Sequence, residues 1–209
     1  MKFSHYLLAA AILASSVSTV RAQYVEPEEK DKVTNLFPEV PFDSLGAKKM
    51  LARGTGTISG VAFTKPKTKL GYKAPLASRI YANKIKIVLL PVTPYFEAWY
   101  KLRDDKENKR KKIFVYMTPQ AFKYRLEAIT NSNGKFTFPE MKPGKYFLQG
   151  FLGWTSSGTY NEYTGSGYNN YGGRTDYYQQ KGYSVSHEDR IETFVEVKSD
   201  GEVVNIKLK

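Results

Sequence analysis

The segment from Ala128 to Phe151 constrains the fold more than any other part of the chain, because three short β segments and two turns fit into it. Asn131 to Gly134 has the composition of a turn, since Asn and Gly adopt a positive φ at little cost. Lys135 to Phe138 alternates so that its two phenylalanines share one face, and Pro143-Gly144 marks the next turn. The segment therefore predicts half of an antiparallel β-sandwich.

Hydrophobic periodicity places the other expected elements. A short helix capped by Asp43 or Ser44 is expected to run to about Ala52, and Tyr95 to Leu102 is expected to form a second, amphipathic helix. Strands are expected at 57–64, 85–90, 113–116, 191–197 and 203–208, with an Asp-Gly turn between the last two. The apolar residues expected to form the core are Ile58, Ile85, Ile87, Leu89, Phe136, Phe138, Tyr146, Leu148, Val195, Val197, Val204, Ile206 and Leu208.

Several of these strands also resemble a known family. Thr130 to Phe138, followed by Met141 to Tyr146, is similar to the T-x-x-x-G-x-F-x-F and L-x-P-G-x-Y patterns of the carboxypeptidase regulatory-like (transthyretin-like, prealbumin-like) β-sandwich, with Met141 where Leu is usual. Gly56 to Ala62 and Ala82 to Thr93 resemble the first and second strands of that family. The resemblance covers roughly residues 54–209 and implies an all-β, seven-stranded Greek-key sandwich. It implies no single function, because such sandwiches host many unrelated roles.

The N-terminus has the pattern of an export signal. Lys2 gives a positive start, a small-residue-rich apolar stretch follows, and Val20-Arg21-Ala22 fits a small-x-small cleavage site. The apolar stretch is too short to favour a membrane span, and no other stretch of the sequence could cross a bilayer. We therefore expect a signal peptide at 1–22, a mature chain that begins at Gln23, and a periplasmic or secreted protein.

Composition narrows the class of protein further. The chain has no cysteine, which excludes disulfides, thiolate metal sites and a lipidated N-terminal cysteine. A secreted eukaryotic domain of this size usually carries disulfides, so a bacterial origin is expected. Signal cleavage removes Lys2 and Arg21 and no acid, so the formal net charge falls from +12 to +10. Such a cationic exported protein attracts anionic partners such as acidic glycans, although the same charge can serve solubility alone.

The domain organisation follows from these patterns. Residues 23–53 are expected to form an extended leader and the short helix, and residues 54–209 the sandwich domain. The leader up to Phe42 is charged, contains proline and has no sustained period, so it is interpreted as extended or disordered. The basic segment 65–81 is a long loop, and the charge run 103–112 is interpreted as a solvated loop.

An insertion at 155–186 is the feature that a sandwich does not need. It contains seven tyrosines and six glycines, with Ser, Thr and Asn between them and almost no aliphatic residue before Val185. The segment therefore cannot build a core of its own. Its composition resembles that of antibody loops, in which tyrosine supplies rigid amphipathic contact area while Ser, Gly and Asn adapt.

Three interpretations of the insertion remain open. It could be a disordered low-complexity loop without a partner, a recognition loop for a protein or a glycan, or a surface for self-association through β-pairing. For the recognition loop, the basic run after the second helix would give electrostatic help. The candidate ligand-binding residues are Trp154, Tyr160, Tyr163, Tyr168, Tyr171, Tyr177, Tyr178, Lys109, Arg110, Lys111 and Lys112.

Catalytic chemistry is not expected from the histidine content. The mature chain keeps only His187, which excludes a His-rich zinc site, so the family resemblance concerns an accessory sandwich and not a catalytic domain. A Ser-His-acid triad would need His187 with Ser184 or Ser186 and Glu188 or Asp189, all close in sequence, whereas triad members usually converge from separate elements. We interpret His187 as an exposed loop residue.

Other chemistries lack their sequence patterns too. The carboxylates lie in charged or polar stretches without the apolar context that raises a pKa, and Gly165-Ser166-Gly167 does not stand between a strand and a helix as a phosphate loop would. Basic and aromatic residues alternate over 110–116, a pattern that can hold single-stranded nucleic acid, but export makes that partner unexpected.

The sequence as a whole predicts an exported, non-catalytic binding or structural module without cofactor or metal. Its expected partner is an envelope protein or an anionic glycan. Self-association as a surface or matrix component is the first alternative, and a hydrolase is the second.

Overall fold

The computed structural model describes residue 28 and residues 32–66 and 76–209. The expected signal peptide, most of the early leader and much of the basic loop 65–81 lie outside these described residues. Within them, no helix has both the length and the apolar character needed to cross a bilayer.

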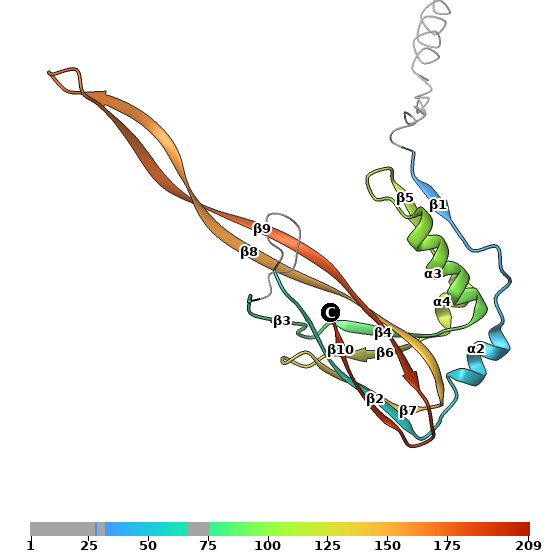
Figure 1. The fold of residues 1–209 in the computed structure, drawn as a ribbon. Coiled ribbons are helices and arrows are strands. Elements are labelled where there is room, and N and C mark those ends of the chain that lie inside the picture. Colours follow the sequence, from blue (N-terminus) through green and yellow to red (C-terminus); the bar gives the residue numbers. More distant parts are fainter. Residues whose placement is uncertain (1–27, 29–31, 67–75) are drawn as a thin grey trace, which may run out of the picture.

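Two four-stranded sheets form the centre of the molecule (Figure 1). In the first sheet, β2 has a parallel neighbour, β10, on one side, and antiparallel neighbours, β7 and β3, on the other. The second sheet has the order β6-β4-β8-β9, and all its neighbours are antiparallel. The strands are β2 (Gly56–Thr64), β3 (Ile80–Tyr81), β4 (Lys86–Pro91), β6 (Leu126–Ile129), β7 (Lys135–Met141), β8 (Gly144–Tyr168), β9 (Arg174–Val197) and β10 (Val203–Leu208).

A single apolar core lies between the sheets, where alternate residues of each strand point inward. It confirms the predicted core: ten of the expected residues are buried in it, and Ile85, Val204 and Ile206 pack against it partly buried. The predicted turn before β7 is also confirmed, because the Gly134 N–H donates to the Asn131 carbonyl at 3.0 Å. Gly134 has a φ of 72°, and a Cβ there would lie 2.3 Å from the Ala62 carbonyl oxygen, so the turn requires glycine.

The outer face of the second sheet is covered by a helix, α3 (Pro94–Lys106), whose Thr93 cap accepts a hydrogen bond from the Phe96 N–H at 3.3 Å. Phe96 and Trp99 of this helix pack on Leu90 and Phe147. The helix expected over 95–102 is therefore confirmed, but it continues to Lys106. The interpretation of 103–112 as a solvated loop is wrong for its first part, because Arg103 is a buried helical residue.

Two short strands and two short helices, from residues 34–50 and 113–123, form a small second layer. β1 (Thr34–Leu36) pairs in parallel with β5 (Ile113–Val115), so this part of the leader is a strand. α2 (Ser44–Met50) confirms the first predicted helix, with Asp43 as its cap, and α4 (Pro119–Lys123) is a short helix that was not predicted. The aromatic ring of Phe42 packs on those of Tyr95 and Tyr124, which fixes the leader to the domain.

The largest departure from expectation concerns the Tyr/Gly insertion. It is not a loop between strands, because the β8–β9 pairing continues from Gly144↔Val197 to Tyr168↔Arg174. β9 begins at Arg174 and not at Ile191. The tight turn is closed by Asn169, whose side-chain oxygen accepts from the N–H groups of Tyr171 and Gly173. The protein is thus a mostly β, sandwich-like fold with one long hairpin that extends far beyond it (Figure 1).

Candidate binding site on the β8–β9 ribbon

The part of the hairpin that leaves the sandwich, residues 155–186, is called the ribbon here. β4 pairs with β8 only as far as Gly150, and beyond that point β8 and β9 pair only with each other among the described residues. At about 3.3 Å per residue, the Thr155–Tyr168 strand would span on the order of 45 Å if fully extended. The ribbon therefore exposes both faces and both edges of a two-stranded sheet.

The strand register divides the ribbon's aromatic residues between two faces, because directly opposed residues share a face and successive residues alternate. The first face continues the core side of the second sheet and carries Trp154, Tyr160, Tyr177 and Tyr183. The second face carries Tyr163, Tyr168 and Tyr178. A register shift between Tyr163 and Gly165 inserts one extra residue, Thr164. As a result, Gly165 is opposed to Tyr177 on the first face, and Tyr168 lies on the second face.

Tyrosine rings on the first face lie over glycines. A Cβ on Gly158 would approach the ring of the opposed Tyr183 to 2.7 Å, and a Cβ on Gly167 would approach the Tyr177 hydroxyl to 3.1 Å. The rings of Tyr160 and Tyr183 are 6.4 Å apart. Glycine facing tyrosine across a strand pair lets the ring cover the backbone, which gives the ribbon some apolar contact without a core.

The second face holds a polar cluster near the tip. The rings of Tyr163 and Tyr178 meet edge to face at 5.8 Å, and the Tyr163 hydroxyl bonds with the Ser166 hydroxyl. Ser166 donates to Asp176 at 2.6 Å, and the Arg174 guanidinium pairs with the same carboxylate at 2.7 Å. Two hydrogen bonds to Asp176 lower its pKa below the ordinary value of 3.8, and the one from Ser166 has a larger effect than the one from Arg174.

The structure places the candidate tyrosines on one element but not on one surface. Tyr160 and Tyr177 share the first face, the other three strand candidates share the second, and Tyr171 lies in the turn with 98% of its surface exposed. Tyr183 is about as exposed as Tyr160 and lies on the same face, yet sequence reasoning did not select it. The alternation of Gly and Tyr at paired positions was the signal that could have found it.

Trp154 and His187 form the base of the ribbon. Their rings stack 4.1 Å apart at 19°, and the Trp154 Nε1–H donates to Asp189 at 3.0 Å. The Thr64 hydroxyl donates to the same Asp189 oxygen at 2.6 Å, and Ser156 bonds the His187 Nε2 at 2.8 Å. Trp154, Ser156, His187 and Asp189 are among the residues that line a cavity of about 460 Å³.

One expectation about this region is wrong, because His187 is a partly buried strand residue and not an exposed loop residue. Asp189, two residues further along the strand, is buried. The hydroxyl beside His187 belongs to Ser156, since the register puts Ser184 and Ser186 on the other face. The contacts of this cluster brace Trp154 against the sandwich.

The basic candidates lie elsewhere. Lys109, Arg110, Lys111 and Lys112 form the turn between α3 and β5, where the Lys111 N–H donates to the Asn108 side chain at 3.1 Å. Figure 1 shows this turn and the ribbon tip on opposite sides of the molecule. The structure therefore does not bring the basic run together with the tyrosines.

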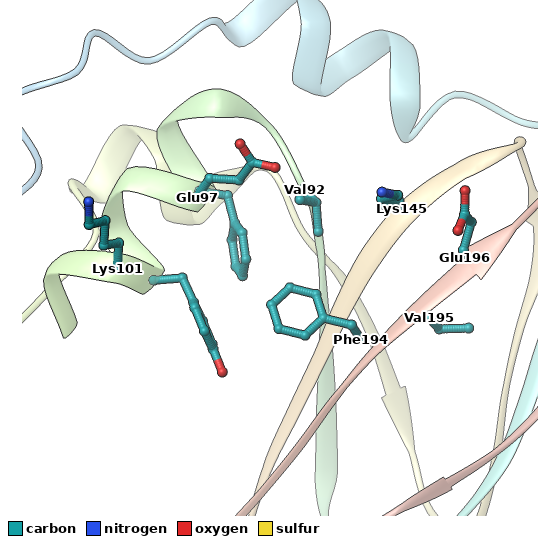
Figure 2. Close-up of a pocket in the computed structure, with 9 residues that line it drawn as sticks. Val92, Glu97, Lys101, Lys145, Phe194, Val195 and Glu196 are labelled. Atoms are coloured by element: carbon teal, nitrogen blue, oxygen red, sulfur yellow. The ribbon is translucent and has the colours of Figure 1, made fainter. Parts of the chain in front are cut away.

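A second concave surface lies between α3 and β9 (Figure 2). It has a volume of about 510 Å³, and Phe96, Tyr100 and Phe194 form its apolar part. Phe194 is 49% exposed, and its ring meets the Tyr100 ring at 5.0 Å. Glu97, Lys101, Lys145 and Glu196 surround it, so positive and negative side chains are balanced at its rim.

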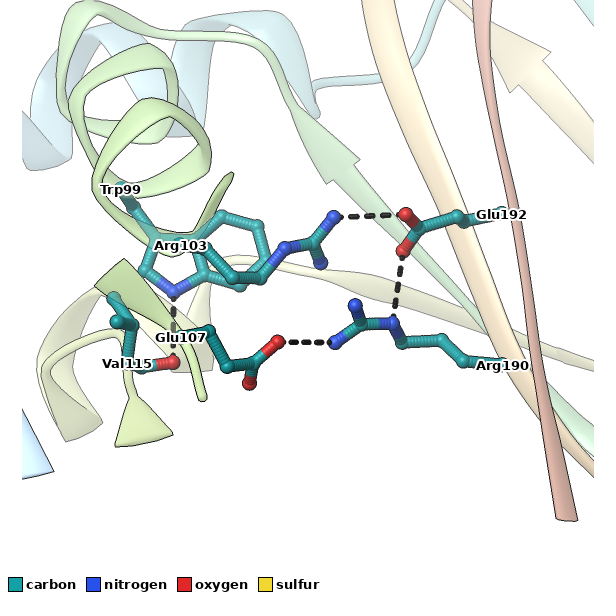
Figure 3. Close-up of polar contacts among 6 residues, drawn as sticks. All are labelled: Trp99, Arg103, Glu107, Val115, Arg190 and Glu192. Carbon is teal, nitrogen blue, oxygen red and sulfur yellow. Dashed lines mark hydrogen bonds and ion pairs between the residues drawn. The ribbon is translucent and has the colours of Figure 1, made fainter. Parts of the chain in front are cut away.

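An ion-pair network fixes the position of α3 relative to the base of the ribbon (Figure 3). Arg103 pairs with Glu192 at 2.8 Å, Arg190 lies 3.5 Å from the other Glu192 oxygen, and Arg190 also pairs with Glu107 at 3.0 Å. The Arg103 guanidinium carbon lies 4.6 Å from the centre of the Trp99 ring. Sequence reasoning missed this network because its two halves are far apart in the chain.

No group of three or more His, Asp or Glu side chains suited to a metal ion occurs within residues 32–66 and 76–209.

The comparisons with known proteins concern the fold. No family model matches the chain, and no curated protein matches it. Among solved structures, it is similar to a proposed carbohydrate-binding protein from Pseudomonas aeruginosa, with a TM-score of 0.51 and 17% sequence identity. The similarity covers 80% of this chain and 96% of that one. At this identity the match shows a shared fold and nothing about the ligand.

Proposed function

We propose that this protein is a non-catalytic module of the bacterial envelope that binds a glycan through the ribbon. The observation that carries the proposal is the ribbon itself: two long strands and their turn, with seven tyrosines and no core, held on a well-packed sandwich. An isolated two-stranded hairpin is marginally stable in water. Ligand binding by the ribbon would explain why such an element extends from the fold.

The chemistry of the two faces favours a glycan. Tyrosine rings offer flat apolar faces against which the C–H groups of a sugar ring can lie, and their hydroxyls can bond sugar hydroxyls. The braced Trp154 and the neighbouring Ser156 and His187 add an aromatic and two polar groups at the base. The role proposed for the Pseudomonas aeruginosa protein of similar fold agrees with this assignment. A protein ligand would use the same tyrosines and is the alternative outcome of the test below.

Export and family membership belong to the same proposal. The signal-like N-terminus, the absence of cysteine and the formal net charge of +10 after cleavage support a periplasmic or secreted module that meets an acidic envelope glycan or an envelope protein. The sequence motifs around Gly134 and Pro143 support a carboxypeptidase regulatory-like, prealbumin-like Greek key as the ancestry of the sandwich.

Substitution of one face at a time tests the proposal. One variant carries Tyr160→Ser, Tyr177→Ser and Tyr183→Ser on the first face; the matched variant carries Tyr163→Ser, Tyr168→Ser and Tyr178→Ser on the second. Both are compared with the unmodified chain on an array of purified bacterial surface polysaccharides. We expect one variant to lose binding at least about tenfold while its melting temperature stays unchanged. Unchanged glycan binding in both variants would contradict the proposal.

A second candidate function is self-association, which the unpaired edges of the ribbon favour, since exposed strand edges pair with other chains. The test uses a short-ribbon variant, in which residues 158–183 are replaced by Asn-Gly after Ser157 and before Ser184, a register pair. Sedimentation velocity should then show concentration-dependent oligomers of the intact chain that the short-ribbon variant does not form. A monomeric intact chain would exclude this candidate.

A further inference from the structure

The outer face of the first sheet carries ordered rows of side chains that the proposed function does not use. β2 lies in the middle, so each of its outward residues has a neighbour from β10 on one side and from β7 or β3 on the other. Ser59 stands between Asn205 and Thr137, and Val61 stands between Lys207 and Lys135. Phe63 is opposed to Tyr81 at the far end.

These rows line one groove with a volume of about 720 Å³. The cationic side chains of Lys135 and Lys207 are exposed, with only Val61 between them in the register. With strands about 4.8 Å apart, their Cα atoms are separated by roughly 10 Å. A third cation, Arg79, lies over the Phe63 ring at 4.8 Å from its centre, and it is also exposed.

The charge of this groove is of one sign. Its lining contains Arg79, Lys135 and Lys207 and no acidic side chain. None of the three cations has an ion pair with a carboxylate in the part of the chain that the structure describes. The groove between α3 and β9 differs, because its two lysines are matched by two glutamates. Three unmatched cations over a concave surface favour an anionic occupant.

The other lining residues indicate what kind of anion fits. Asn133, Asn205, Ser59 and Thr137 offer amide and hydroxyl groups that bond to sugar hydroxyls, and the Ser59 and Thr137 hydroxyls already lie 3.3 Å apart. The half-exposed Tyr81 gives one aromatic surface beside the cations. Nucleic-acid strands are instead held along longer basic tracks with several stacking rings.

We propose that this groove binds a short segment of an acidic polysaccharide, with Lys135, Lys207 and Arg79 on its carboxylate, sulfate or phosphate groups and Tyr81 against a sugar ring. Ammonium and guanidinium groups make charge-assisted hydrogen bonds to such anions. The roughly 10 Å between the two lysines allows each to bond an anionic group on a different sugar unit. The site is separate from the ribbon, so either proposal can fail without the other.

The test measures calorimetric binding of trigalacturonate to the intact chain, with fully methyl-esterified trigalacturonate as the uncharged probe. A sulfated and a phosphorylated trisaccharide distinguish the anionic group. We expect the K135Q/K207Q variant to bind the best acidic probe at least about tenfold more weakly than the unmodified chain. The K48Q/K49Q variant removes the same charge from exposed residues of α2 and should bind as the unmodified chain does.

The short-ribbon variant should keep full affinity for the acidic probe, which separates this groove from the ribbon. R79Q provides an independent variant in case the double substitution fails to fold, and it should also weaken binding. Three results would overturn the proposal: no binding of any acidic trisaccharide, an equal loss in K48Q/K49Q, or preferential binding of oligo-dT with the same dependence on Lys135 and Lys207.

Discussion

At the scale of single residues, the sites that matter most are polar groups whose partners come from distant parts of the chain. Arg103 is buried on α3 and finds its carboxylate on β9, 89 positions away. Asp189 accepts from Thr64 and Trp154 where the ribbon leaves the sandwich. Such groups cost free energy unless they are paired, so each partner fixes the position of the element that carries it.

Glu192→Gln should lower the free energy of unfolding by about 2 kcal/mol, because it leaves the buried Arg103 without its carboxylate, and the partial exposure of Glu192 reduces the larger cost of a fully buried pair. Glu162→Gln removes the exposed pair with Lys181 and should cost less than about 0.5 kcal/mol. Urea denaturation followed by tryptophan fluorescence gives both values. Equal costs would mean that the Arg103 pair contributes no more than a surface pair.

The carboxyl group of Asp176 should titrate below its ordinary value of 3.8, because the Ser166 hydroxyl and then Arg174 stabilise its charged form. A lowered pKa in the folded protein means that this contribution is present above pH 3.8 and is lost only as the pH falls through the lower, folded value. Carbon-13 NMR of the side-chain carboxyl measures the midpoint. Ser166→Ala should raise it more than Arg174→Gln, and an unchanged midpoint in both would refute the tip cluster.

At the scale of the elements, the strands of the two sheets pack against a core, whereas the two strands of the ribbon pair only with each other among the described residues. The second sheet is packed on both faces, by the core on one side and by α3 on the other. The same two strands, β8 and β9, continue as the ribbon with exposed side chains on both faces. Local stability should therefore fall sharply along each strand.

Hydrogen exchange should reveal this gradient. Paired backbone amides of the ribbon between 158 and 183 should exchange at least about a hundredfold faster than those of β8 between Phe147 and Gly150, because opening the ribbon exposes no core. Mass spectrometry of peptides from the two regions gives the comparison. Equal protection would show that the ribbon has a partner, such as a second copy of the chain.

The start of α3 offers a further test. Thr93 is buried, and its side chain accepts the Phe96 N–H at 3.3 Å, so Thr93→Ala removes a cap and should cost about 1 kcal/mol. Thr93→Ser keeps the hydroxyl and should recover most of that loss. Thermal unfolding of both variants measures the difference. A Ser variant as unstable as the Ala variant would mean that methyl packing, and not the cap, is lost.

Local patterns predicted much of the sandwich. Gly134 and the alternating Phe136 and Phe138 specify a turn and a strand by themselves, and the structure has both. The extent of the ribbon could not be predicted, because its Ser, Asn and Gly residues have low strand propensity and only pairing across the hairpin aligns them. The helical extension to Lys106 was missed because the burial of Arg103 depends on Glu192 from β9.

The candidate site was predicted in composition but not in geometry. The sequence directed attention to the tyrosines, and they lie on the ribbon, but only the register reveals that they form two faces and that Tyr183 belongs with Tyr160. The basic run at Lys109 is remote from them. The cationic groove could not be predicted from the sequence, because Lys135 and Lys207 become neighbours of Val61 only when β7 and β10 pair with β2.

At the scale of the whole molecule, the buried core and the proposed binding surfaces lie in different parts of the fold. The two sheets and α3 bury the apolar residues, and seven of the exposed tyrosines lie on the ribbon, which could be shortened without opening the core. The cationic groove lies on the first sheet, and no residue of the ribbon lines it. If the proposed function is right, substitutions on the ribbon or in the groove should change binding without changing the stability of the core.

The measurement that tests the central claim most directly is capture of envelope material by the full-ribbon chain and by the short-ribbon variant, both carrying K135Q/K207Q so that the cationic groove does not contribute, with the melting temperature of each measured in parallel. We predict nearly equal melting temperatures and a glycan that only the full-ribbon chain retains. Capture of the same material by both proteins, at equal stability, would contradict the claim that the ribbon is the recognition element.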